Sequence, residues 1–489
     1  MRAAPMQGSQ TNAELARIDM ETLTMALLTY CLDGADALMF ACLKGADDPR
    51  QILGLLLALS GRDPGAFDLP APRSHQAAAG ELDRIFCLGL SRWGRSVNHQ
   101  ALRSLHLSRD RWTHRLDSLP SGRLDNLLPW LTAEGSQWII SPSSPYWPRQ
   151  LADLSIRKDW APPLCLWGQG DPGALVSCPQ PMAIVGSRGC NDYGRQVAYS
   201  LGREAGQAGH LLVSGGALGS DASAHRGSLA ACSEYGLAHA GRTVAVFAGG
   251  LNHQGPQSNL PLFETILAQD GALISELCPG TIPEPRRFLL RNRIIAALAS
   301  VVVVAQARLR SGALNTANWA AELNREVYAA PGAIDQPANA GCNRLILEGK
   351  ATILTSSKAC TQICHEGHRP LFPQAQAPYS GMITPDQASG RRVPIDGTLV
   401  GQEGMDGDGT RQTNEPTARS PLAQAILAAL RHCRRQKEDA TIDRILTLSQ
   451  RRMAEPIPIG QLNQELGLLE MEGAIFLRGG SISLATGSG

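Results

Sequence analysis

Short apolar runs alternate with Ala-rich amphipathic segments between residues 181 and 357. The runs read MAIV, LLVS, TVAVF, ALIS, VVVVA and EVYAA, and the segments between them carry apolar residues at helical spacing. Those segments are long enough for the crossover helices that join parallel strands. The run at residues 301–305 is apolar throughout, as expected of a central strand covered on both faces. The pattern therefore predicts an α/β fold with an extended Rossmann-like parallel sheet.

Helical periodicity precedes this core. Residues 1–135 place apolar side chains at helical spacing, with interruptions at Gly and Asp-Pro, and predict a small N-terminal helical module. Residues 136–180 are rich in Pro and aromatic residues. This second segment predicts an extended connector that docks onto the next domain.

Beyond the core, the composition of the chain changes twice. Residues 358–420 are rich in Pro, Gly and small polar residues, and they cannot bury enough apolar surface to offset the entropy of ordering. They predict a flexible linker. Residues 421–489 return to helical periodicity and end in a Gly-Gly turn between two short β-like runs. This order predicts a winged-helix-like C-terminal domain.

Length and composition indicate a folded protein with several domains. The 489 residues exceed the size at which one hydrophobic core stops growing, and a hydrophobic fraction of 43% excludes a chain that is disordered throughout. No apolar run approaches the roughly 18 residues of a membrane span, and no secretory signal is recognisable at the N-terminus. We therefore expect a soluble, cytoplasmic protein.

The twelve cysteines are scattered along the chain, which indicates reduced thiols rather than a secreted disulfide scaffold. One cluster contains four residues of the types that bind zinc: Cys360, Cys364, His365 and His368. Because Cys364 and His365 are adjacent and the usual finger spacing is missing, surface polar residues at a domain edge are the better interpretation. The sequence predicts neither a bound metal nor a cofactor.

Glycine-rich segments follow three of the predicted strands. They read Gly186-Ser187-Arg188 after the first strand, Ser214-Gly215-Gly216 after the second, and a pair that begins with Gly249 after the third. Parallel strands present their carboxyl ends at one edge of the sheet, where open α/β folds bind ligands. Backbone N–H groups at the start of a following helix attract anions there. We predict an anion-binding crevice; the alternative is ordinary turn chemistry, in which glycine serves only steric needs.

The net charge of the whole chain is +1, so any nucleic-acid footprint has to be local. Between residues 286 and 310 there are six arginines and no acidic residue; they are Arg286, Arg287, Arg291, Arg293, Arg308 and Arg310. Such a run can neutralise several phosphates of a polymer, and a solvated basic face is the alternative. Phe288 lies in this run and can either stack on an unpaired base or belong to the core.

Eight ordered blocks carry a resemblance to a known family. They are IVGSR (184–188), YG (193–194), SGGALGSDASAHRG (214–227), AGGLNHQGPQSN (248–259), SELCPGTIP (275–283), RNRIIAALA (291–299), SGALNTA (311–317) and VYAAPGAI (327–334). In this order they resemble the DprA/Smf family (DNA processing protein A). The resemblance implies an extended Rossmann fold that binds single-stranded DNA without covalent catalysis. It also implies a homodimer that protects the incoming strand and passes it to the RecA recombinase in natural transformation.

The resemblance assigns a surface for DNA and phosphate, position by position. Its residues would be Gly186, Ser187, Arg188, Arg291, Asn292, Arg293, Ser311, Gly312 and Thr316. The glycine-rich strand ends and the basic run add Ser214, Gly215, Gly216, Gly249, Arg287 and Phe288 to the expected site. Four residues would organise the surrounding loops, namely Asp221, His225, Asn259 and Glu276. The segment LLEMEGAI (468–475) also resembles the last helix and wing of the family's C-terminal domain.

Six positions depart from the family pattern. They are Leu218 in place of Arg, Ser220 in place of Ile, Gly255 in place of Tyr, Leu289 in place of Pro, Gln306 in place of Glu and Asn324 in place of Gly. Together they remove one charge of each sign and one backbone turn. We expect the fold to tolerate these changes, with different affinity or partner choice.

Two other functions remain open. An enzyme or sensor could bind a nucleotide in the same crevice, with His225, Glu276 and Asp221 as candidate acids or bases. No HxE…CxxC, Walker A or Ser/His/Asp arrangement supports a defined reaction. Alternatively, the terminal modules bind proteins. The predicted wing LRGGSISLA has Arg478 as its only charge, which favours a protein contact over duplex DNA.

Overall fold

The structure is a computed structural model, and it divides the chain into two compact units, Met1–Met382 and Ile383–Gly489. It describes residues 18–34, 36–156, 161–358, 360–363, 420–436, 440–453, 457, 462, 465–466, 469, 475–478 and 481–484. No helix among these residues is both long enough and apolar enough to cross a membrane.

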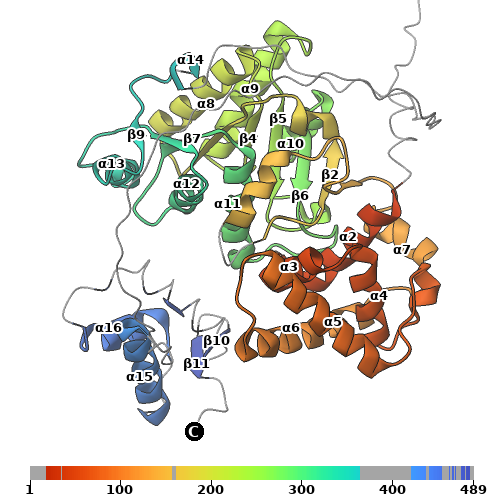
Figure 1. Cartoon of the computed structure of the whole chain (residues 1–489). Coiled ribbons are helices and arrows are strands. Elements are labelled where there is room, and N and C mark those ends of the chain that lie inside the picture. Colours follow the sequence, from red (N-terminus) through yellow and green to blue (C-terminus); the bar gives the residue numbers. More distant parts are fainter. Residues whose placement is uncertain are drawn as a thin grey trace, which may run out of the picture. The chain divides into compact units, whose positions relative to one another are not determined.

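A nine-stranded sheet forms the centre of the first unit, with the strand order β1-β2-β6-β5-β4-β3-β7-β8-β9 (Figure 1). The strands are β1 (Trp138–Ile140), β2 (Leu166–Gly170), β3 (Met182–Gly186), β4 (Leu212–Ser214), β5 (Thr243–Phe247), β6 (Ala272–Ser275), β7 (Val301–Gln306), β8 (Glu326–Ala329) and β9 (Thr352–Ile353). Strands β3 to β9 pair in parallel. Each of the six predicted runs forms a strand, so the parallel α/β fold is confirmed.

The segment expected to be a connector contributes two strands instead. Strand β2 pairs antiparallel with β6, and β1 pairs antiparallel with β2, which extends the sheet beyond its parallel part. Both strands are short, and neighbouring prolines obscured their pattern in the sequence. Trp167 of β2 is completely buried, and its indole Nε1–H donates to the carbonyl oxygen of Leu131 at 2.9 Å. The segment therefore joins the sheet to the helical module.

Helices cover both faces of the sheet. They are α8 (Asp192–Gln207), α9 (Ser220–Tyr235) and α10 (Leu260–Ala268) on one face, and α11 (Pro285–Leu298) and α12 (Gly312–Glu322) on the other, with α13 (Ala340–Leu347) beside β7 and β8. Along β3, Ala183 and Val185 pack with α11 and α12, whereas Met182 and Ile184 pack with α8. This alternation buries both faces and explains why the strands are apolar at most positions. Single-turn and 3₁₀ elements complete the unit: η1 (Pro64–Phe67), η2 (Arg149–Ile156), η3 (Pro172–Val176), η4 (Leu251–His253), η5 (Gln257–Asn259) and α14 (Cys360–Ile363).

Six helices form the expected N-terminal helical module. They are α2 (Met20–Leu32), α3 (Ala37–Gly45), α4 (Pro49–Leu59), α5 (His75–Arg92), α6 (His99–Asp117) and α7 (Leu124–Leu131). Side chains that precede five of them accept hydrogen bonds from the first turn, namely Asp19, Asp36, Asp48, Ser74 and Asn98. The apolar core of the module is continuous with Cys165 and Trp167 at β2 and with Cys278 after β6. The module is therefore fixed to the antiparallel side of the sheet.

The second unit contains α15 (Pro421–Gln436), α16 (Ile442–Gln450) and the antiparallel pair β10 (Ile475–Arg478) and β11 (Ser481–Leu484). Ile426, Leu430 and Ile445 are buried in its core. Helices followed by a hairpin match the predicted order, and the winged-helix identity stays a prediction.

Part of the sequence interpretation lies outside the described residues. Most of the predicted linker and three members of the Cys/His cluster, Cys364, His365 and His368, belong to the segment 364–419. The fourth member, Cys360, is completely buried among apolar side chains against the α8 face of the sheet.

The crossing of α3 and α5 generates a stability prediction. A β-carbon at Gly89 would collide with the carbonyl oxygen of Ala41, whereas a β-carbon at Gly80 on the same helix would meet nothing within 4 Å. We expect Gly89→Ala to lower the free energy of unfolding by about 2 kcal/mol because the helices must move apart. Gly80→Ala should raise it by about 0.5–1 kcal/mol through helix propensity. Urea denaturation followed by tryptophan fluorescence measures both, and equal effects would contradict the close crossing.

Candidate nucleic-acid interface

The carboxyl ends of β3, β4, β5, β6 and β7 meet at one edge of the sheet, called here the carboxyl edge. The chain reverses its direction of strand addition between β3 and β7, which is where open α/β sheets bind their ligands. The Ser187 N–H donates to the Gln306 carbonyl oxygen at 2.8 Å, so the ends of these two strands are bonded together. A β-carbon at Gly186 would collide with Ser220 at the start of α9. Glycine is required there because α9 begins directly against β3.

The glycine loop after β4 is rigidly held. Gly216 and Gly219 have φ angles of +66° and +78°, which favour glycine. A β-carbon at Gly215 would collide with the Arg291 guanidinium. The Asn259 Nδ2 donates to the carbonyl oxygens of Gly216 and Ala217 at 3.0 and 3.2 Å. These two bonds connect Asn259 to the backbone of the loop.

Arg188 lies exposed at the end of β3, and its guanidinium stacks over the Phe288 ring at 4.8 Å from the ring centroid. Phe288, on the first turns of α11, is half-buried. Arg188 forms no ion pair with any described residue. It therefore presents an exposed positive charge on an aromatic support.

The arginines of α11 are placed differently from the expectation. Arg287 is 8% exposed, and its Nη2 lies 2.6 Å from Asp33 Oδ1 in the helical module. Arg293 is completely buried and pairs with the carboxylate of Glu276. Neither side chain is available to contact a DNA strand. The assignment of Arg287 and Arg293 to the DNA surface is therefore corrected. The sequence does not reveal such burial because Asp33 lies 254 positions away from Arg287.

Arg291 lies directly beneath the glycine loop. Its Nη1 donates to the Val246 carbonyl oxygen at 3.0 Å, and burial lowers the pKa of its guanidinium to about 10, an effect opposed by the nearby Asp221 carboxylate. Burial raises the pKa of Asp221, and Arg291 opposes that rise. The two buried charges stabilise each other, so Arg291 supports the loop from below and is a poor candidate for direct contact with DNA.

Two accessible cations of the basic run lie outside the expected site. Arg308 and Arg310 follow β7, are exposed, and form no ion pair with the part of the chain that the structure describes. Because β7 is the neighbour of β3, this places them on the same edge as Arg188. Their position immediately after a predicted central strand was the signal that could have identified them.

The region after β7 is built from side-chain amides and a capped helix. Ser311 accepts a hydrogen bond from the Ala313 N–H and begins α12. Asn292 donates to the Gly312 carbonyl oxygen at 3.3 Å, and Thr316 is buried. Ser311 and Gly312 therefore lie at the surface, whereas Asn292 and Thr316 lie below it.

Two departures from the family pattern have structural explanations. Gln306 accepts from the Asn191 N–H at 3.0 Å and donates from Nε2 to the Asn191 and Asn339 side-chain oxygens at 2.9 and 2.7 Å. An ionised carboxylate could not donate these two bonds. Asn324 has a φ of +55°, so the turn expected to be lost is kept, because Asn tolerates left-handed backbone. Leu218 and Leu289 are exposed, and nothing in the structure explains them.

The other polar residues at the carboxyl edge make their contacts inside the protein. Ser214 Oγ donates to the Ile184 carbonyl oxygen at 2.6 Å, and a β-carbon at Gly249 would press on the backbone of Thr281 and Pro283. His225 is completely buried with its Nδ1 2.7 Å from Thr243 Oγ1. Burial lowers the pKa of His225 to about 3, so the imidazole is neutral near pH 7.

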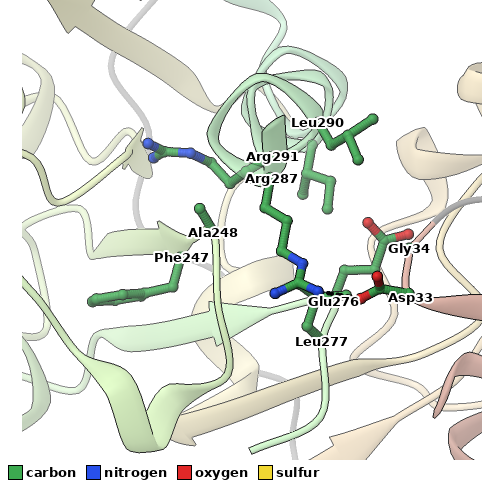
Figure 2. A pocket seen from close by; sticks show the side chains of 10 residues that line it. Asp33, Gly34, Phe247, Ala248, Glu276, Leu277, Arg287, Leu290 and Arg291 are labelled. Atoms are coloured by element: carbon green, nitrogen blue, oxygen red, sulfur yellow. Dashed lines mark hydrogen bonds and ion pairs between the residues drawn. The ribbon is translucent and has the colours of Figure 1, made fainter. Parts of the chain in front are cut away.

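A small cavity lies between the helical module and the ends of β5 and β6 (Figure 2). It measures about 10 Å³, and its walls are Asp33, Gly34, Phe247, Ala248, Glu276, Leu277, Arg287, Leu290, Arg291 and Ile294. That space is close to what one water molecule occupies and far below a nucleotide pocket. Among the described residues no group of His, Cys, Asp and Glu could hold a metal ion.

Comparison with known proteins gives one consistent family. The sequence model of DNA recombination-mediator protein A matches residues 138–365. The chain is 31% identical over 366 residues to Protein Smf of Synechocystis, covering 73% of this chain and 83% of that protein. It is 37% identical over 235 residues to a DNA processing protein DprA of Mycobacterium tuberculosis, covering 47% of this chain and 58% of the length of that relative.

Two solved structures were also found. DNA processing protein A from Streptococcus pneumoniae shares 27% identity with a TM-score of 0.46, covering 68% of this chain and 98% of that one. The Helicobacter pylori protein of the same name, described for its single-stranded DNA binding mode, shares 27% identity with a TM-score of 0.39, covering 45% of this chain and 92% of that one.

Buried His225 generates a pH prediction. The unfolded chain takes up a proton at the imidazole near pH 6.5. In the folded chain the imidazole stays neutral until the pH falls to its pKa of about 3. Between these values the histidine should lower the free energy of unfolding by about 1.4 kcal/mol for each pH unit of acidification.

The measurement compares the wild type with His225→Gln by urea denaturation from pH 7 to pH 4. The variant should be less stable at pH 7. Its free energy of unfolding should fall less on acidification, because glutamine takes up no proton when the chain unfolds. Parallel pH profiles for the two proteins would show that His225 is not held neutral.

Proposed function

Because the chain belongs to the DNA recombination-mediator protein A family, also known as DprA/Smf, we propose that it binds single-stranded DNA across its carboxyl edge. One observation carries the proposal. Three exposed arginines, Arg188, Arg308 and Arg310, follow the ends of neighbouring strands and form no ion pair with the described chain. Cations in this arrangement neutralise consecutive phosphates, which supplies affinity without sequence preference.

The preference for a single strand rests on the stacked pair beside these charges. Phe288 supports the Arg188 guanidinium and keeps part of its own surface exposed. Planar side chains of this kind stack on bases, which only an unpaired strand offers freely.

We propose binding without covalent catalysis. His225 is buried and neutral, Glu276 pairs with Arg293, and Asp221 lies beneath the glycine loop. General acid or base catalysis needs such groups within reach of a substrate, and internal contacts occupy all three. The nucleotide-binding alternative would have to use other residues.

The later steps of the proposal follow from family membership. The protein would protect the bound strand and pass it to the RecA recombinase during natural transformation. RecA-dependent strand exchange, measured with and without the protein, tests this step; an unchanged rate would limit the function to strand binding.

We also propose that the protein acts as a homodimer through the far end of the sheet. Three apolar residues are exposed around the edge strand β9: Ile334 (96% exposed), Leu347 (86%) and Ile353 (47%). Strand β9 is the last strand of the sheet at this end among the residues that the structure describes, and a sheet edge flanked by apolar side chains favours association with another copy.

Arg188→Ala should weaken binding of a labelled mixed-sequence single strand for all sequences tested. The dependence of log K on log salt should become shallower by about 0.7, because one phosphate contact is lost. A salt series with the single strand and the matching duplex measures both affinity and preference.

The matched control is Arg203→Ala, which removes a half-buried arginine of α8 that pairs with Glu234. It should leave both affinity and slope unchanged. Unaltered binding by Arg188→Ala would remove that residue from the site. If the wild type binds no single strand, the proposal fails and a titration with nucleotides becomes the next experiment.

Leu347→Arg should convert the dimer to a monomer, because a charge in an apolar contact lacks a partner. Sedimentation velocity measures the state. Leu107→Arg, at an exposed leucine of the helical module, is the control and should leave the dimer intact. A wild type that sediments as a monomer would contradict the proposed dimer.

A further inference from the structure

Helix α6 of the helical module carries a line of arginines outside the carboxyl edge. Arg103, Arg111 and Arg115, called here the arginine stripe, lie on one face with Leu107, because residues four apart lie one above another on a helix. Arg103 and Arg111 are exposed, and the opposite face of the helix packs into the module core. From Arg84 to Arg123 the chain has eight arginines, two aspartates and neither glutamate nor lysine.

The stripe is connected to α11 through one carboxylate. Arg115 Nη1 lies 3.4 Å from Asp33 Oδ2, and Asp33 also accepts from Arg286 and Arg287, each at 2.6 Å. Figure 2 shows Asp33 and Arg287 side by side at the cavity. Arg286 is 64% exposed and precedes Phe288 by two residues. Asp33 and Arg286 thus link the stripe to the first turns of α11, which also carry Phe288.

The charge at this junction remains positive. Three arginines surround Asp33, and Glu284 is the second acid, at 3.4 Å from Arg286 and 3.6 Å from Arg287. Three positive and two negative charges leave a balance of +1. A phosphate would not meet a negative barrier in passing from one part of the surface to the other.

The stripe differs from an ordinary solvated helix face. Solvated helices pair opposite charges three or four residues apart, as Arg84 and Glu81 do on α5. Arg103 and Arg111 have no acidic residue at those distances, and Arg111 and Arg115 are a like-charged pair four apart. The acids of α6 are Asp110, which pairs with Arg109 at 3.1 Å, and Asp117. Arg115 pairs with Asp33, so Arg111 is the member of this pair that forms no ion pair with the described residues and can meet an external anion.

We propose that a nucleic-acid strand leaving the carboxyl edge passes Arg286 and continues along the arginine stripe, bound through its phosphates. The inference rests on the proposed function. From Arg103 to Arg115 the stripe spans about 18 Å at the rise of an α-helix, so it adds room for several nucleotides. It makes the helical module part of the binding surface for long strands.

The test uses the full chain with a short strand of about 6 nucleotides and a long one of about 30, spanning the usual range of site sizes. The double variant Arg103→Ala/Arg111→Ala should bind the short strand as the wild type does. With the long strand it should lose affinity several-fold, and its salt slope should become shallower by about 1.4, the value for two phosphate contacts.

The control is Arg50→Ala/Arg84→Ala, which removes the same charge from the same module at exposed arginines that pair with Asp48 and Glu81. It should leave both strands unaffected. An equal loss in the control would assign the effect to net charge and overturn the inference.

Arg188→Ala separates this inference from the proposed function. If Arg188→Ala loses affinity for both DNA strands while the double variant still binds the long one, the stripe is a solvated face and the inference is wrong. The proposed DNA binding at the carboxyl edge would then still hold. If the wild type binds neither strand, both proposals fall. Thermal unfolding of the double variant should match that of the wild type, because both side chains are exposed.

Discussion

Helix α11 buries three arginines, and each needs a partner because an unpaired charge in the protein interior costs several kcal/mol. Arg287 finds Asp33 in the helical module, Arg291 lies beside Asp221 below the glycine loop, and Arg293 pairs with Glu276 after β6. These contacts tie α11 to the module and to two strand ends. They also fix the first turns of α11, which hold Phe288 under Arg188.

Pairing divides the basic residues into two groups. The buried arginines are balanced inside the chain and set the shape of the carboxyl edge. Arg188, Arg308 and Arg310 form no ion pair with the described chain, so their exposed charges can interact with an anionic ligand. The same distinction on α6 separates Arg109, which pairs with Asp110, from Arg103 and Arg111. Neutralisation within the fold, rather than the number of arginines, decides which surface can attract phosphate.

Glycine and amide residues make this arrangement possible. Gly186 and Gly215 allow α9 and Arg291 to approach the backbone more closely than any side chain would permit. Gln306 bonds to two asparagines where the family pattern has a carboxylate. The departures from the family at Gln306 and Asn324 therefore leave the scaffold intact, and the exposed Leu218 and Leu289 change only its surface.

The sequence alone determined the parallel core, since the apolar runs that became β3 to β8 are buried on both faces and show this locally. It also determined the glycine-rich edge and the family, through ordered motifs. Only the tertiary structure decided which arginines face solvent, because Arg287 and Asp33 are 254 positions apart and no local pattern records their pairing. For the same reason the sequence did not predict β1 and β2. These strands are short and lie near prolines, and their contacts with β6 and the helical module stabilise them rather than a local sequence pattern.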